Sequence, residues 1–144
     1  MIGQAYTPDP PLPVPQRNAD NAPYWDGAAE GRLLLQRCRK SGQVWLYPRQ
    51  ISPATWDASD AEWFEASGLG EVHSFSIVHR ASEPGYRSLT PFVVALIDLE
   101  EGARMMTNII GPNALEVAIG DKVRCVFEAR GEGINVPQFL REER

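Results

Sequence analysis

Apolar and polar residues alternate along the second half of the chain. The pattern is clearest in residues 122–130, where Val123, Cys125, Phe127 and Ala129 alternate with charged side chains. Because neighbouring side chains of a strand point to opposite faces, this alternation predicts a strand with one buried face. Similar patterns predict five strands in all, at residues 70–80, 91–100, 103–110, 122–130 and 134–139.

The order of these strands predicts the fold class. Residues 111–121 form a predicted short helical turn between the third and fourth strands, and glycine-containing segments make the tight connections. Five short strands with a helical insert at that point favour a mainly β protein built on a five-stranded OB-fold barrel. A small β-sandwich is the alternative.

The chain begins with a proline-rich segment at residues 1–17. Five prolines lie between Pro8 and Pro15, and this composition predicts an extended arm without a core of its own. Such an arm is either a disordered tail or a segment that lies on a partner subunit.

A short amphipathic helix and a hairpin are predicted next. Asp20 or Asn21 can cap the helix, and Gly31 is a typical helix end. The β-rich runs "RLLLQRC" and "QVWLY" are separated by "RKSG", which is typical of a turn. Residues 57–69 carry no pattern that assigns them to an element.

The hairpin contains the spacing of a zinc ribbon without its ligands. If all four positions were cysteine, the run would read C-x2-C-x10-C-x2-C; the residues present are Cys38, Ser41, Ser52 and Thr55. Hydroxyl groups do not ionise near neutral pH, so one thiol and three hydroxyls predict no bound zinc. We expect an aromatic core to hold this degenerate ribbon instead, formed by Trp45, Tyr47, Trp56 and Trp63.

The predicted organisation therefore has three parts. The proline-rich arm covers residues 1–17, the helix and degenerate ribbon cover residues 18–67, and the OB barrel covers residues 68–144. A chain of 144 residues is long enough for one compact domain with a small appendage.

Composition excludes several classes of function. The net charge of -5 argues against a generally basic nucleic-acid binder. The N-terminus has no secretory signal pattern, and the longest apolar run, "PFVVALI", is too short to span a membrane. Two cysteines do not make a disulfide framework, which predicts a reducing, cytoplasmic compartment.

No catalytic residue is predicted. His73 and His79 lie six positions apart on one expected strand, roughly 20 Å from each other, so they cannot share a metal ion. Cys125 falls on the buried face of its strand, where a free cysteine behaves as a small apolar side chain. Neither "GLG" nor "GEG" has the context of a phosphate-binding loop.

Positive charge is concentrated around the degenerate ribbon. Residues 32–49 hold five cations and no acid, whereas the rest of the chain holds nine cations and 19 acids. A local positive patch on an acidic protein suggests a site for an anion such as phosphate. The alternative is a solvated face, or internal pairing with the acids of residues 57–71. The cations are Arg32, Arg37, Arg39, Lys40 and Arg49.

Several segments in order resemble a known family. "DNAPYWDGAAEGRLLLQRCRKSG", "YPRQISPAT", "EWFEASGLGEVHSFSIVHR", "PFVVALIDLEEGARMMTNIIG" and "IGDKVRCVFE" are similar to the acyl-CoA-associated OB-fold family, a domain-of-unknown-function family. Its members join an N-terminal helix, a rubredoxin-like zinc ribbon and an OB barrel. The resemblance covers residues 18–139, and the family's zinc positions fall on Cys38, Ser41, Ser52 and Thr55, so three of the four depart from the pattern.

The resemblance implies a function. Members of this family are similar to non-catalytic accessory subunits that dock on thiolase-like, aldolase or hydratase enzymes and help to hold an acyl-CoA thioester. The hypothesis for this chain is such a subunit, with no metal and with a homodimer as one possible assembly. Trp45 would offer a surface to adenine or pantetheine, and the coenzyme's phosphates would be attracted by Arg37, Arg39, Lys40 and Arg49.

Two other classes of function remain open. OB barrels often bind single-stranded nucleic acid, but that function needs a basic groove with exposed aromatic side chains, and the predicted barrel region is acidic. An enzyme in its own right would need an acid, a base and a nucleophile brought together, and the sequence shows no such set.

Overall fold

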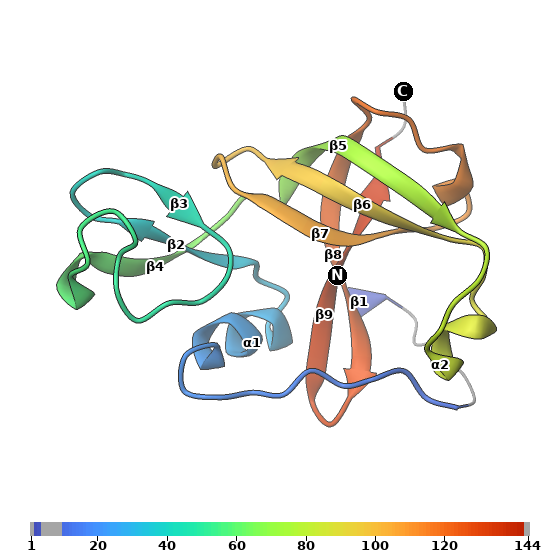
Figure 1. The fold of residues 1–144 in the computed structure, drawn as a ribbon, viewed down its shortest axis with the longest axis horizontal. Coiled ribbons are helices and arrows are strands. Elements are labelled where there is room, and N and C mark those ends of the chain that lie inside the picture. The colour runs from blue at the N-terminus through green and yellow to red at the C-terminus, as the bar shows by residue number, and fades with distance from the viewer. Residues whose placement is uncertain (1, 4–9, 143–144) are drawn as a thin grey trace.

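The computed structural model describes residues 2–3 and 10–142, and its larger sheet is an OB barrel (Figure 1). Pairing runs from β5 to β6, β7, β9 and β8 and returns to β5, which is the strand order of an OB fold. The predicted fold class is confirmed, and the sandwich alternative is wrong. The strands are β5 (Leu69–Val78), β6 (Phe92–Leu99), β7 (Arg104–Ile110), β8 (Lys122–Gly131) and β9 (Ile134–Arg141).

Two short helical elements connect barrel strands. The predicted helical insert between β7 and β8 is the 3-10 turn η2 (Ala114–Glu116). A second helix, α2 (Pro84–Arg87), joins β5 to β6 and was not predicted from the pattern. At the N-terminus, β1 (Ile2–Gly3) pairs in parallel with β8.

The smaller sheet lies beside the barrel and has the strand order β3-β2-β4 (Figure 1). Its central strand is β2 (Leu34–Cys38), flanked by β3 (Val44–Trp45) and β4 (Ala61–Glu65). A 3-10 turn, η1 (Ala58–Asp60), leads into β4. The segment that sequence reasoning left unassigned therefore supplies the third strand of this sheet.

The helix α1 (Ala22–Ala29) connects the two sheets. A Cβ atom on Gly27 would lie 2.7 Å from Leu34 Cγ, so only glycine allows this close approach of α1 to β2. On the barrel side, Asn135 Nδ2 donates to Ala28 O at 3.3 Å. The helix is thus fixed to both sheets.

One hydrophobic core extends across both sheets. The core cluster contains Ala28 of α1, Leu33 and Leu35 of the small-sheet segment, and barrel residues such as Ile97 and Phe139. Leu35, Ile97 and Phe139 are fully buried. Because each side chain removes apolar surface from water in the same cluster, the small sheet and the barrel stabilise each other.

The proline-rich arm lies on the protein's own barrel. Leu12 is buried, and a Cβ atom on Gly85 of α2 would lie 2.8 Å from the carbonyl oxygen of Pro11. For residues 10–17 the prediction of a disordered tail is therefore wrong, although the segment is extended as expected. Contact of the arm with a partner subunit stays a prediction. Residues 4–9 lie outside the described part of the chain.

Within residues 2–3 and 10–142, no helix has both the length and the apolar character needed to cross a membrane.

Candidate functional site

The degenerate ribbon positions converge around Cys38, at the end of β2. Cys38 and Ser52 are both fully buried, and the Ser41 amide donates to Cys38 Sγ at 3.5 Å. Hydrogen bonds from the hydroxyl groups of Ser41 and Ser52 lower the pKa of the Cys38 thiol to about 7. The fourth position turns away, because Thr55 Oγ1 donates to Asp60 Oδ2 at 2.7 Å.

These residues do not fit a structural zinc ion. A ribbon zinc is held by thiolate or imidazole ligands, and here a single thiol faces two hydroxyl groups. The described residues contain no group of three or more His, Cys, Asp or Glu side chains that could hold a metal ion. The ribbon positions therefore do not supply the ligand set of a structural zinc site.

The predicted aromatic core of the ribbon forms only in part. Trp45 is 8% exposed, but Trp56 and Tyr47 are 78% and 69% exposed. Rings that remain in water contribute little burial, so the prediction is wrong for these two residues. Trp63 is partly buried on β4.

A buried amide holds the ribbon instead. Gln36, on β2, is 2% exposed, and its Oε1 accepts from Trp45 Nε1 and from the Arg49 amide, both at 2.8 Å. Its Nε2 donates to Arg49 O at 2.8 Å. Sequence reasoning missed Gln36, although Leu34 and Cys38 share its strand face and indicate that it points inward.

The cationic patch is largely paired with acids of the same chain. Arg37 Nε lies 2.7 Å from Glu62 Oε1, and Arg39 Nη1 lies 3.3 Å from Glu62 Oε2. Lys40 Nζ lies 3.9 Å from Asp60 Oδ2. The hydrogen bond from Arg37 holds the pKa of Glu62 below its usual value. The prediction of a free positive patch is wrong for these three cations, and internal pairing is the alternative that holds.

The register of the small sheet explains this pairing. β2 and β4 are antiparallel, and Arg37 stands directly opposite Glu62. Cross-strand neighbours of opposite charge attract each other, and Arg39 and Lys40, which directly follow β2, reach the acids around the start of β4 from the turn. Each pair is partly exposed, and exposed ion pairs contribute little to stability.

The other two predicted site residues lie in different settings. Trp45 is buried, with its indole bound to Gln36, so it is not a surface on which a ring could stack, and that prediction is wrong. The Arg49 side chain is exposed, and no carboxylate of the described residues lies within 4.0 Å of it. Its backbone is fixed on both sides by Gln36. Arg49 is therefore a positioned cation that can meet a ligand.

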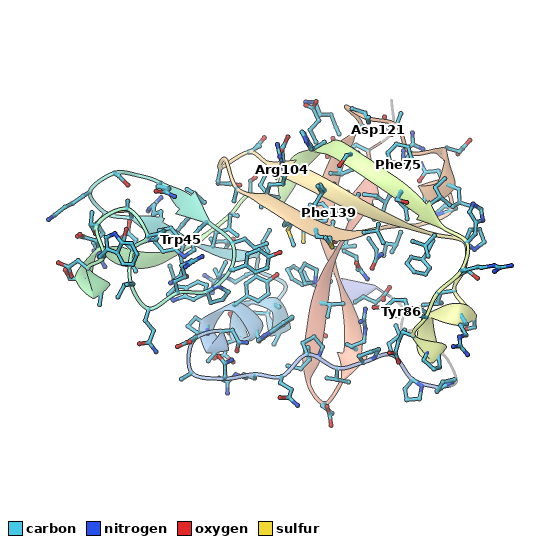
Figure 2. The ribbon with its side chains drawn as sticks, in the orientation of Figure 1. Trp45, Phe75, Tyr86, Arg104, Asp121 and Phe139 are labelled. Atoms are coloured by element: carbon cyan, nitrogen blue, oxygen red, sulfur yellow. The ribbon has the colours of Figure 1, made fainter. Side chains whose placement is uncertain are left out.

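A groove lies between the small sheet, α1, α2 and the barrel. One cavity of about 390 Å³ is lined by α1, by the loop after β3 and by β7 and β9. A second cavity of about 330 Å³ lies between α2, the end of β7 and β8. We call the two cavities together the barrel groove; both are lined by Tyr86, Asn108, Arg130 and Gln138. In Figure 2, Tyr86 lies where α2 meets the barrel.

The groove lies over the weakest seam of the barrel. β7 and β9 pair only through Ile109–Phe139 and Ile110–Leu140. Two positions earlier in the same register, Thr107 would stand opposite Pro137. Pro137 cannot donate a backbone hydrogen bond, and its carbonyl oxygen accepts from Thr107 Oγ1 at 3.2 Å. Pro137 within the predicted strand at residues 134–139 is a sequence signal that could have indicated this short pairing.

Side chains satisfy the backbone groups that the open seam leaves unpaired. Gln138 Oε1 accepts from the Asn108 amide at 3.3 Å, and Asn108 Nδ2 donates to Val93 O at 2.9 Å. These polar groups form the floor of the groove, whereas its walls are mainly apolar, with Leu12 and Phe92 among them.

The groove is lined mainly by apolar side chains and by a few polar groups. The described residues that line the two cavities include no histidine, cysteine or serine, and their only carboxylate is Glu128. Tyr24 also lines the groove, and burial raises the pKa of its hydroxyl, which therefore stays protonated. An apolar groove with a few fixed polar groups is typical of a ligand-binding or docking module.

Comparison with known proteins identifies the class and then the family. The family described as "ChsH2, C-terminal OB-fold domain" matches residues 63–128. A DUF35 domain-containing scaffold protein of Methanothermobacter thermautotrophicus is 34% identical over 70% of this chain and 76% of the relative. The chain belongs to the DUF35 family, and the resemblance seen in the sequence is confirmed.

Two further comparisons concern a solved structure and a longer relative. The solved structure described as "Ltp2-ChsH2(DUF35) aldolase" superposes with a TM-score of 0.77 and 30% identity, covering 89% of this chain and 98% of that chain. A probable enoyl-CoA hydratase alpha subunit of Thermomonospora curvata is 34% identical over 74% of this chain. The match covers only 33% of the length of that subunit.

Proposed function

We propose that this protein is a non-catalytic accessory subunit that docks on a thiolase-like, aldolase or hydratase enzyme of acyl-CoA metabolism. The observation that carries the proposal is the match to 98% of the chain in the structure described as "Ltp2-ChsH2(DUF35) aldolase". The scaffold description of one relative and the hydratase alpha subunit description of another support it. The absence of histidine, cysteine and serine from the described groove lining agrees with a subunit that binds and does not react.

We further propose that the barrel groove holds the apolar part of an acyl-CoA thioester. Each cavity is within the size range of a small-molecule site, and the walls are mainly apolar. Tyr47 and Pro48 line one end of the groove, and Arg49 follows them directly in the chain. A phosphate of the coenzyme would meet Arg49 there, with Arg37, Arg39 and Lys40 as exchangeable flanking cations.

The docking proposal is tested by reconstitution. The chain is co-expressed with the acyl-CoA aldolase, thiolase-like or hydratase subunit encoded beside it, and the mixture is analysed by size-exclusion chromatography with light scattering. A stable complex whose enzyme activity falls when this chain is omitted is the expected result. Elution of the chain at the mass of its own monomer, 16.0 kDa, or of a homodimer, beside a fully active enzyme, would contradict docking.

The ligand proposal is tested with a matched pair of charge reversals. Arg49→Glu should weaken octanoyl-CoA binding about tenfold in calorimetry, because a charge-assisted hydrogen bond is lost and a repulsion is added. Arg124→Glu on β8 makes the same change of net charge at an exposed position outside both cavity linings. An equal loss in the two variants would show a general field effect and would reject a phosphate site at Arg49.

The cytoplasmic compartment, the homodimer and the absence of nucleic-acid binding stay predictions. Among the described residues that line the groove there is one arginine, and it lies 3.7 Å from a carboxylate, which is unfavourable for a nucleic-acid backbone.

A further inference from the structure

Arg130 is a buried cation at the junction of the two cavities. Its side chain is 9% exposed, and it lines both parts of the barrel groove. Sequence reasoning placed Arg130 on the outward face of its strand, together with Glu128. In the structure this face is covered, because Leu12 of the arm and Tyr86 of α2 line the same cavity.

The backbone around Arg130 is built irregularly. The pairing of β8 with β9 shifts register between Ala129 and Gly131, so Arg130 is the extra residue of a β-bulge. Bulges change the direction of a side chain and occur next to functional sites. Gly131 has a φ of +109°, a conformation that favours glycine. The bulge therefore fixes how Arg130 enters the groove.

The guanidinium group is only partly satisfied. Arg130 Nη2 lies 3.7 Å from Glu128 Oε1, and Nη1 donates to the Tyr86 hydroxyl oxygen at 3.4 Å. Nε is buried, and no acceptor of the described residues is within hydrogen-bond distance of it. A buried donor of a charged group without an acceptor is costly, and such groups are rare in folded proteins.

The local charge indicates which acceptor fits. Glu128 already provides a negative charge beside Arg130, so the pair is neutral as a whole. A second carboxylate or a phosphate would leave an excess negative charge in a mainly apolar groove, which is unfavourable. A neutral oxygen, such as the carbonyl oxygen of a ketone, ester or amide, satisfies Nε without adding charge.

We propose that Arg130 binds a neutral carbonyl oxygen in the middle of an otherwise apolar ligand. The oxygen belongs in the middle because Arg130 lies at the boundary of two cavities, each of which can hold an apolar arm of the ligand. This inference deepens the proposed function and rests on it in one respect: it states which chemical group of an acyl ligand the groove selects. Glu128 acts as the counter-charge that excludes anions.

The experiment uses two small probes with the same two propyl arms. 4-Heptanone carries a neutral carbonyl oxygen between the arms, and 2-propylpentanoate carries a carboxylate there. Each is titrated into the ¹⁵N-labelled protein, and the Arg130 Nε–H signal is followed by NMR. We expect 4-heptanone to shift that signal in a saturable way and to bind about tenfold more tightly than 2-propylpentanoate. An Nε–H signal that does not move with the ketone, or a tighter complex with the carboxylate, would overturn the proposal.

Three variants separate recognition from stability. Arg130→Met should weaken 4-heptanone binding about tenfold or more, and Arg130→Lys, which keeps the charge near Glu128 but has no Nε–H, should weaken it similarly. Glu128→Gln should reverse the preference in favour of 2-propylpentanoate. Unchanged selectivity in Glu128→Gln contradicts the counter-charge role, and the measurement on the unaltered protein decides the question if a variant does not fold. Docking on an enzyme subunit is measured separately by light scattering, so failure of either idea can be recognised.

Discussion

Replacing Gln36 with methionine tests what holds the degenerate ribbon together. The two side chains have similar length and volume, so the substitution mainly removes hydrogen bonds. Three bonds of 2.8 Å are lost, from Trp45 Nε1, from the Arg49 amide and to the Arg49 carbonyl oxygen. A bond of this kind contributes about 1 kcal/mol, and a buried donor left unsatisfied costs about 1–3 kcal/mol.

The expected loss follows from these magnitudes. The Trp45 indole is buried and has no access to water, whereas the Arg49 backbone is partly buried and can regain water contacts. We therefore expect Gln36→Met to lower the free energy of unfolding by about 3 kcal/mol. For a chain of this length, such a loss lowers Tm by about 10 °C. Urea unfolding followed by tryptophan fluorescence measures the first quantity.

A matched variant and a local probe make the result specific. Gln50→Met changes the same residue type in the same small-sheet region, but Gln50 lies in the loop after β3, is exposed and makes one bond, to Asp20 Oδ1 at 2.5 Å. Its effect should stay within about 0.5 kcal/mol. The Trp45 indole N–H should exchange with solvent much faster in Gln36→Met than in the unaltered protein. Equal stability losses in the two variants would reject Gln36 as the staple of the ribbon.

Three further predictions concern stability, pH and metal. Asp121→Asn removes the negative charge that faces Arg141; the two side chains are 7% and 8% exposed. The substitution should lower the free energy of unfolding in urea by about 3 kcal/mol. A loss below about 1 kcal/mol would contradict a stabilising buried pair. The Ser41 and Ser52 hydroxyls lower the pKa of the Cys38 thiol to about 7, below that of the unfolded chain, so stability should rise between pH 7 and pH 9 more in the unaltered protein than in Cys38→Ser. Identical pH dependence of unfolding in both proteins would refute this sign. Treatment with EDTA should leave Tm unchanged, and elemental analysis should find far less than one zinc per chain; one zinc per chain would show that the ribbon binds metal after all.

The degenerate ribbon illustrates how a fold can be kept when three of four metal-ligand positions carry other residues. A ribbon zinc holds two loops together through four bonds. Here the buried Gln36 side chain is hydrogen-bonded to both Trp45 and Arg49. The Cys38 thiol accepts hydrogen bonds from the hydroxyl groups of Ser41 and Ser52. The loop geometry is kept, and Tyr47 and Pro48 remain at the mouth of the groove.

The sequence by itself determined the barrel and the family. Strand positions such as residues 122–130 could be predicted because alternation is a local property, set by the geometry of neighbouring residues. The absence of zinc ligands could be predicted from residue chemistry alone. Cys125 is partly buried, and burial raises the pKa of its thiol to about 12. This agrees with the expectation of an unreactive cysteine.

Only the tertiary structure shows which charged residues pair and where the groove lies. Arg37 and Glu62 are 25 residues apart, and only the register of β2 and β4 makes them partners. The groove is assembled from the arm, α1, α2 and four barrel strands, β6 to β9, so no single segment carries its pattern. Arg130 became a buried cation because distant residues cover its strand face. Local pattern fixes which elements form, but the pairing and covering of side chains depend on contacts between elements far apart in the chain, which a local pattern does not encode.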